Sequence, residues 1–65
     1  MIILSKHAKE QARERGINIS EIRLTIQKGA KYTQYPNKIV SEWSHIRIIY
    51  KKMKDNYFII TVMLR

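Results

Sequence analysis

Residues 46–64 read I-R-I-I-Y-K-K-M-K-D-N-Y-F-I-I-T-V-M-L, and this stretch decides the fold. It is rich in Ile, Val, Tyr and Phe, which favour β-strands. Two strands are predicted, Ile46–Met53 and Tyr57–Leu64, with Lys54-Asp55-Asn56 as a three-residue hairpin loop. An odd loop puts six apolar residues on one face, because side chains alternate along each strand: Ile46, Ile48, Tyr50, Ile60, Val62 and Leu64. The opposite face then carries His45, Arg47, Ile49, Lys51, Ile59, Thr61 and Met63.

Two weaker strand candidates precede this hairpin. Tyr32–Tyr35 is short and is followed by a turn at Pro36-Asn37. Lys38–Trp43 comes next. Residues 31–65 are therefore predicted to form an antiparallel sheet.

The first thirty residues predict two helices instead. Ser5 can cap a helix over Lys6–Arg15 that stops at Gly16. The apolar members of this helix are Ala8 and Ala12, so it should lie shallowly on the core with its charges in solvent.

The second helix begins at Asn18. Glu21 follows three residues after this cap, and Ile17 and Ile22 flank the pair, which fits a capping box with a hydrophobic staple. The helix is expected to end before Gly29 and to carry three isoleucines on one face, namely Ile19, Ile22 and Ile26.

Together these elements predict one α+β domain over residues 1–65. Two N-terminal helices would pack on the apolar face of a C-terminal antiparallel sheet of about four strands. The other face would stay open, cationic and partly hydrophobic.

Charge is the strongest compositional signal. The chain has 65 residues and thirteen Lys and Arg against five Asp and Glu, a net charge of +8. This favours a polyanionic partner, RNA first and DNA second, although a merely soluble surface is the alternative. With no cysteine and no apolar run long enough to span a membrane, a cytoplasmic protein is expected.

Several kinds of chemistry are disfavoured. The five carboxylates and two histidines show no metal-ligand spacing, and Gly16 and Gly29 are assigned to helix ends rather than a phosphate-binding loop. The serines have no recognisable nucleophile context. No cofactor is therefore expected.

Metal-free RNA cleavage needs only a base, an acid and cations for the developing charge. His7 and His45 can move protons, and Arg15, Arg47 and Lys51 can bind phosphate. Hydrogen bonds or base stacking could come from Tyr50, Tyr57 and Thr61. Each residue also has a structural alternative. Arg15 can stabilise a helix end, His45 can be a solvated turn residue, and the strand cations can prevent aggregation.

The chain resembles a small bacterial family of uncharacterised domains whose opening signature runs H-A-x-x-R-x-x-x-R-G-I-S. His7-Ala8, Arg15-Gly16-Ile17 and Ser20-Glu21-Ile22 carry this resemblance, and Tyr35-Pro36 and Ile60-Thr61-Val62 match later landmarks. The resemblance implies a fold related to RelE-like and barnase-like toxin ribonucleases, often neutralised by an antitoxin.

One position departs from the signature, because its first arginine is Gln11 here. His7, Gln11 and Arg15 form one helical row, so the row loses a cation. The resemblance marks His7 and Arg15 as motif matches and places Thr61 in the terminal strand.

The first hypothesis is a metal-independent endoribonuclease of toxin type. Its expected catalytic residues are His7, Arg15, Arg47 and Thr61, and its expected nucleic-acid contacts are Gln11, His45, Tyr50, Lys51 and Lys52. The second is a non-catalytic nucleic-acid-binding module. Gln11, which replaces the arginine of the signature, is the feature that motivates this hypothesis. The third is a protein-interaction module that docks an antitoxin or other acidic protein. Exposed apolar residues on the open face (Ile49, Ile59, Met63) also suggest a protein partner or a homodimer.

Overall fold

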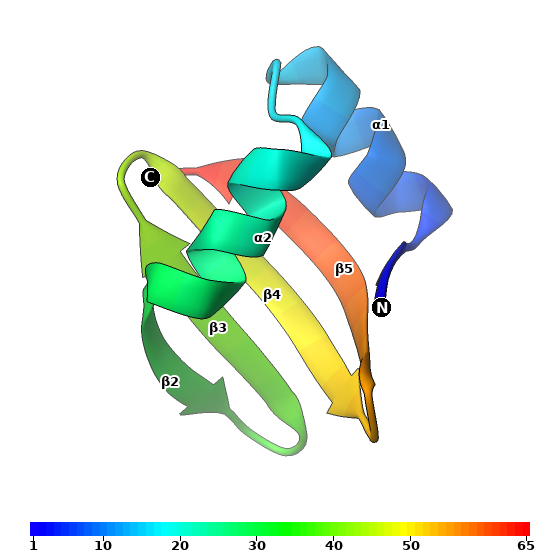
Figure 1. Ribbon diagram of the computed structural model, residues 1–65, viewed down its shortest axis with the longest axis vertical. Helices are drawn as coiled ribbons and strands as arrows, with labels where there is room; N and C mark the ends of the chain where they lie inside the picture. The colour runs from blue at the N-terminus through cyan, green and yellow to red at the C-terminus, as the bar shows by residue number, and fades with distance from the viewer.

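A computed structural model describes all 65 residues, and Figure 1 shows two helices on one side of a single sheet. The elements are β1 (Ile2–Leu4), α1 (Lys6–Glu14), α2 (Ile19–Lys28), β2 (Ala30–Gln34), β3 (Lys38–Trp43), β4 (Ile46–Met53) and β5 (Asn56–Leu64). The strand order is β1-β5-β4-β3-β2, antiparallel except for the parallel β1–β5 pair. The predicted α+β class, with both helices on one face, is confirmed.

The expected strand count was one too low. Ile2–Leu4 forms a fifth strand, which pairs with the start of β5. Ile2 and Leu4 pack against the core cluster, so pairing and burial stabilise a segment of only three residues. Such a strand depends on its partner and leaves little local pattern in the sequence.

The predicted helix boundaries agree with the structure except that α1 ends at Glu14, one residue before the predicted Arg15. Ser5 Oγ accepts a hydrogen bond from the Ala8 N–H at 3.0 Å, and α1 ends where Gly16 takes a left-handed φ of 67°. Asn18 and Glu21 form the reciprocal capping box, with bonds of 2.9 and 3.0 Å.

The prediction that α1 lies shallowly on the core is confirmed, because its buried residues are Ala8 and Ala12. Ile17 and Ile22 are also buried, as the staple requires. Ile19 differs from the prediction, since it is 44% exposed in the first turn of α2.

The β4–β5 hairpin corrects the predicted loop. Met53 pairs with Asn56, so the loop has two residues, Lys54 and Asp55, and Lys54 takes a left-handed φ of 53°. A register shift beside Ile49 and Tyr50 compensates for the shorter loop.

This shift divides the hairpin into a correctly predicted part and a corrected part. Ile46 faces Leu64 and Ile48 faces Val62, as expected, but Tyr50 faces Ile59 rather than Ile60. Ile59 is consequently fully buried in the core instead of lying on the open face.

Gly29 lets α2 pass closely over β3. A side chain there would collide with the Thr25 carbonyl oxygen and come within 2.7 Å of that of Glu42. The backbone of Glu42 is thus held directly against the end of α2.

Candidate nucleic-acid interface

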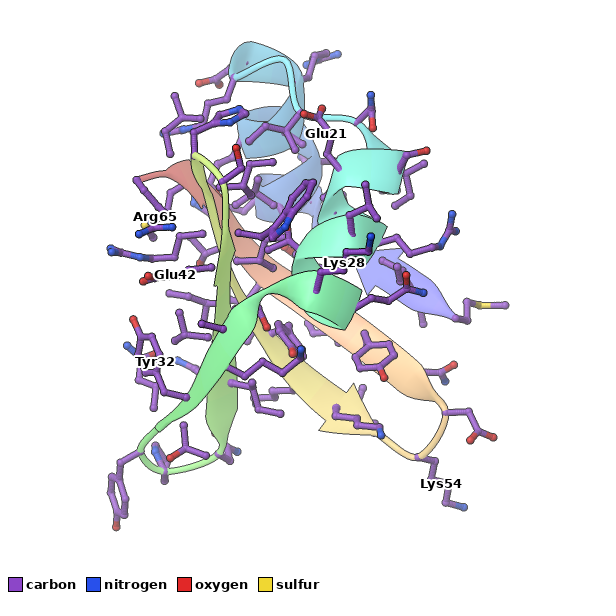
Figure 2. The ribbon with its side chains drawn as sticks, turned by 60° about the vertical axis from the view of Figure 1, so that its left-hand side comes forward. Glu21, Lys28, Tyr32, Glu42, Lys54 and Arg65 are labelled. Atoms are coloured by element: carbon purple, nitrogen blue, oxygen red, sulfur yellow. The ribbon has the colours of Figure 1, made fainter.

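The face of the sheet opposite the helices is uncovered. Figure 2 shows Tyr32, Glu42 and Arg65 on the side away from α2, which carries Glu21 and Lys28. Directly paired residues of adjacent strands share a face, so the register defines this surface row by row. Arg47, Ile49, Lys51, Thr61 and Met63 lie on it, as predicted. We call it the open face.

The middle row of the open face is mainly apolar. It runs across four strands through Tyr32, Val40, Ile49 and Thr61. Val40 is only 1% exposed, although it lies on this face between its paired neighbours Tyr32 and Ile49. The Tyr32 ring remains half exposed at the β2 edge.

The row nearest the β4–β5 turn carries the free cations. Ile39 pairs with Tyr50, so the adjoining positions bring Lys38 beside Lys51. Lys51 pairs in turn with Phe58. Among the thirteen Lys and Arg side chains, only Arg47 and Arg65 form ion pairs, so neither lysine is neutralised by a carboxylate. Lys38, Lys51 and Phe58 therefore follow one another across three adjacent strands; we call these three residues the Lys–Phe row.

The opposite end of the open face carries a carboxylate among cations. Glu42 accepts hydrogen bonds from Arg47 Nε at 2.7 Å and from the Tyr32 hydroxyl at 3.1 Å. Arg65 Nε lies 3.7 Å from the other carboxylate oxygen. The hydrogen bond from Arg47 is the main cause that holds the pKa of Glu42 below its usual value. Arg47, predicted to hold phosphate, is thus already paired with a carboxylate.

The helical row predicted for catalysis lies along the free edge of β5. Ser5 binds the carbonyl groups of Ile59 and Ile60. Further along α1, Gln11 Oε1 accepts a bond of 3.0 Å from the Val62 N–H. His7 is exposed on α1 between these two anchors. The stretch of β5 beside this row contains Thr61, whose side chain belongs to the open face.

Gln11 and Arg15 have structural partners in this arrangement. The Gln11 side chain docks α1 onto β5 rather than reaching out to a phosphate. Arg15 NH1 lies 3.4 Å from the backbone oxygen of Gln11 at the end of α1. Neither residue lies in the Lys–Phe row.

Three other predicted contacts lie outside the open face. Tyr50 is 1% exposed, and its hydroxyl is 2.9 Å from that of Ser41 inside the core, so its ring cannot meet a base at the surface. Lys52 lies on the helix side, with its ammonium 5.6 Å from the centre of the Tyr57 ring. His45 is exposed at the β3–β4 turn, where Nδ1 is 3.2 Å from Ser44 Oγ.

Lys38, Phe58 and Tyr32 were not predicted as site residues. The assumed hairpin register placed Phe58 with the core residues, and the actual register reverses its face. Lys38 was assigned to a strand without a face, and Tyr32 becomes part of this surface through its pairing with Val40. A two-residue hairpin loop at Lys54-Asp55 would have been the signal for Phe58.

Outside the open face, the structure has one cleft and no candidate metal site. No group of three or more His, Asp or Glu side chains is placed to hold a metal ion. A cleft of about 310 Å³ lies between α2 and the β1–β5 edge, lined by Met1, Ile2, Arg23, Ile26, Gln27 and Tyr57. No helix is long and apolar enough to cross a membrane.

Comparison with known families identifies the chain. A family model described as "Domain of unknown function (DUF4258)" matches residues 4–64, and the chain belongs to this family. No curated protein and no solved structure matches it. Membership in a family of uncharacterised domains is thereby confirmed, while the relation to RelE-like and barnase-like ribonucleases stays a prediction.

Proposed function

We propose that this member of the DUF4258 family binds single-stranded RNA across its open face. The observation that carries the proposal is the Lys–Phe row, in which Lys38 lies beside Lys51, Lys51 pairs with Phe58, and no carboxylate is paired to either lysine. A row of cations beside a partly exposed aromatic ring suits a sugar-phosphate backbone with unstacked bases.

The layout of the aromatic rings favours a single strand over a duplex. Phe58 on β5 and Tyr32 on β2 lie in different rows, and across the strands they are three strand spacings apart, about 14 Å. Bases can stack on such rings only if they are free of a duplex, because paired bases are enclosed in their own stack. The lysines between them would contact the phosphates that connect those bases.

This proposal is tested by fluorescence anisotropy at physiological salt. A labelled RNA strand is titrated with the protein and compared with a duplex and with a DNA strand of the same length and sequence. Tighter binding of the single strand than of the duplex is the expected result. Equal affinity for the strand and the duplex would show that binding depends only on net charge. No binding of the single strand would contradict the proposal.

RNA cleavage is a second candidate, favoured by one observation. Ser5 and Gln11, which flank His7 on α1, hydrogen-bond to the stretch of β5 that contains Thr61. In such a reaction the RNA 2′-hydroxyl gives its proton to a base and attacks phosphorus, and the 5′-oxygen leaves as it is protonated. His7 would serve as base or acid, and Thr61 would donate a hydrogen bond.

Cleavage is tested on a denaturing gel in excess EDTA with the wild type, His7→Ala and His45→Ala. Products from the wild type and His45→Ala but not from His7→Ala would support the assignment of His7. If the RNA stays intact with every protein at concentrations that saturate binding, the cleavage hypothesis is rejected and only the binding function remains.

An acidic protein partner is the competing reading of the same positive charge. It predicts weak RNA affinity at physiological salt, together with no dependence on Lys38, Lys51 or Phe58. The RNA affinity measured in the anisotropy titration, repeated with variants of these three residues, separates an RNA partner from an acidic protein partner.

A further inference from the structure

Three donors from different parts of the chain converge on the Glu42 carboxylate. Arg47 Nε lies 2.7 Å and the Tyr32 hydroxyl 3.1 Å from the same oxygen, and Arg65 Nε lies 3.7 Å from the other. Figure 2 shows Tyr32, Glu42 and Arg65 together on the open face. We call Tyr32, Arg47 and Arg65 the anion cradle.

The cradle is held in place from several sides. Arg65 Nη1 donates to the Ser44 carbonyl at 3.0 Å, and its backbone N–H donates to the His45 carbonyl at 2.9 Å. Tyr32 belongs to β2 and Arg47 to β4. Two guanidinium groups and a phenol hydroxyl therefore surround one anion before any ligand arrives.

A phosphate group requires the same donors that the carboxylate uses. Guanidinium groups bind carboxylate and phosphate oxygens with the same planar set of N–H donors. No hydrogen bond engages the terminal nitrogens of Arg47, and the side chains of both arginines remain partly exposed, at 39% and 44%. The feature that opposes phosphate here is the negative charge of Glu42 itself.

We propose that the anion cradle is a second phosphate subsite of the RNA-binding face, and that Glu42 occupies it as a built-in competitor. This inference rests on the proposed function. In the wild type the carboxylate excludes an RNA phosphate from this end of the face, so the phosphates are bound in the Lys–Phe row. Glu42 thereby limits how many phosphates the protein neutralises and where the strand runs.

The direct test compares Glu42→Gln with Glu10→Gln. Both substitutions raise the net charge equally, but Glu10 lies on the exposed surface of α1 and forms no ion pair. Glu42→Gln should tighten RNA binding about fivefold at physiological salt, since it removes one like charge at contact distance. It should also steepen the dependence of log K on log salt by roughly 0.7 for each added phosphate. Glu10→Gln should change the salt slope little.

A titration with inorganic phosphate tests the anion cradle in the absence of RNA. In Glu42→Gln, titrated phosphate should shift the Arg47 Nε–H resonance in NMR spectra, and the same concentrations should leave that resonance unchanged in the wild type. Equal shifts in both proteins would overturn the competitor role, and no shift in the variant would overturn the subsite.

A further comparison uses a protein that retains Glu42. Lys51→Gln should flatten the salt slope by about 0.7, whereas Arg47→Gln should leave it close to the wild-type value. An Arg47→Gln slope as flat as that of Lys51→Gln would contradict the inference. If neither wild type nor Glu42→Gln binds RNA, the proposed function itself fails. If the wild type binds through Lys51 but Glu42→Gln matches Glu10→Gln, only the competitor is rejected.

Discussion

The side-chain oxygen of Gln11 accepts a hydrogen bond of 3.0 Å from the backbone N–H of Val62. This bond closes the edge of β5 beyond Ile59, where β1 has ended and no further strand pairs with it. An arginine could not make this contact, because a guanidinium has donors and no acceptor. The departure of Gln11 from the arginine signature thus has a structural reason in the docking of α1.

Gln11→Ala should therefore lower the free energy of unfolding by about 1–2 kcal/mol, because it leaves a part-buried N–H without its partner. Urea unfolding followed by circular dichroism gives the value. Gln27→Ala is the control, since Gln27 is exposed on α2 and makes no such bond. Equal stability of the two variants would show that the Gln11 contact adds nothing.

The buried pair of Ser41 and Tyr50 gives a second stability prediction. Their hydroxyl oxygens are 2.9 Å apart in the core. Tyr50→Phe should cost about 1–3 kcal/mol, because it leaves the Ser41 hydroxyl buried and unpaired. The double variant Tyr50→Phe with Ser41→Ala should recover part of this loss, as both partners are then apolar. A double variant with the summed cost of both single changes would argue against direct pairing.

The same tyrosine should make the protein sensitive to alkali. Burial raises the pKa of the Tyr50 phenol above the ordinary value of 10.0. Below pH 10 the phenol is neutral in both states and its full contribution is present. As the pH rises above that value, the unfolded chain ionises first, so stability falls until the pH has passed through the folded-state pKa. Thermal unfolding above pH 10 should show this loss in the wild type and a smaller loss in Tyr50→Phe.

Phe58 tests the stacking part of the RNA proposal. Loss of one stacked base costs about 1–3 kcal/mol, so Phe58→Ala should weaken the binding of single-stranded RNA roughly 5- to 150-fold. Phe58→Trp should keep most of the affinity, because the indole offers a larger face. Anisotropy titrations of the folded variants measure these affinities. An unchanged affinity in Phe58→Ala would contradict base stacking on Phe58.

Much of the fold follows from local sequence signals. The Asn18–Glu21 capping box and the left-handed Gly16 mark the helix ends, and each acts over a few residues. The hairpin register is less local. Lys54 carries a left-handed φ that lysine rarely adopts, and Ser5 binds the Ile60 carbonyl beside the register shift. The Lys54 conformation hides the two-residue loop because lysine is unusual there, and the Ser5 contact comes from outside residues 46–64.

The candidate site was only partly predictable for the same reason. Lys51 and Thr61 were placed on the open face from strand alternation alone. The pairing of Arg47 with Glu42 requires the β3–β4 register, and Tyr32 joins them only through the pairing of β2 with β3. Without those registers, Glu42 appears in the sequence as one scattered carboxylate.

The salt dependence of RNA binding tests the central claim most directly. A double variant, Lys38→Gln with Lys51→Gln, is compared with Lys9→Gln and Arg13→Gln, which remove the same charge from the exposed surface of α1. If the open face binds RNA, the first pair should flatten the slope of log K against log salt by about 1.4, corresponding to two lost phosphate contacts, and the second should change it little. Equal flattening by both pairs would show that RNA responds only to net charge, and would contradict a binding site on the open face.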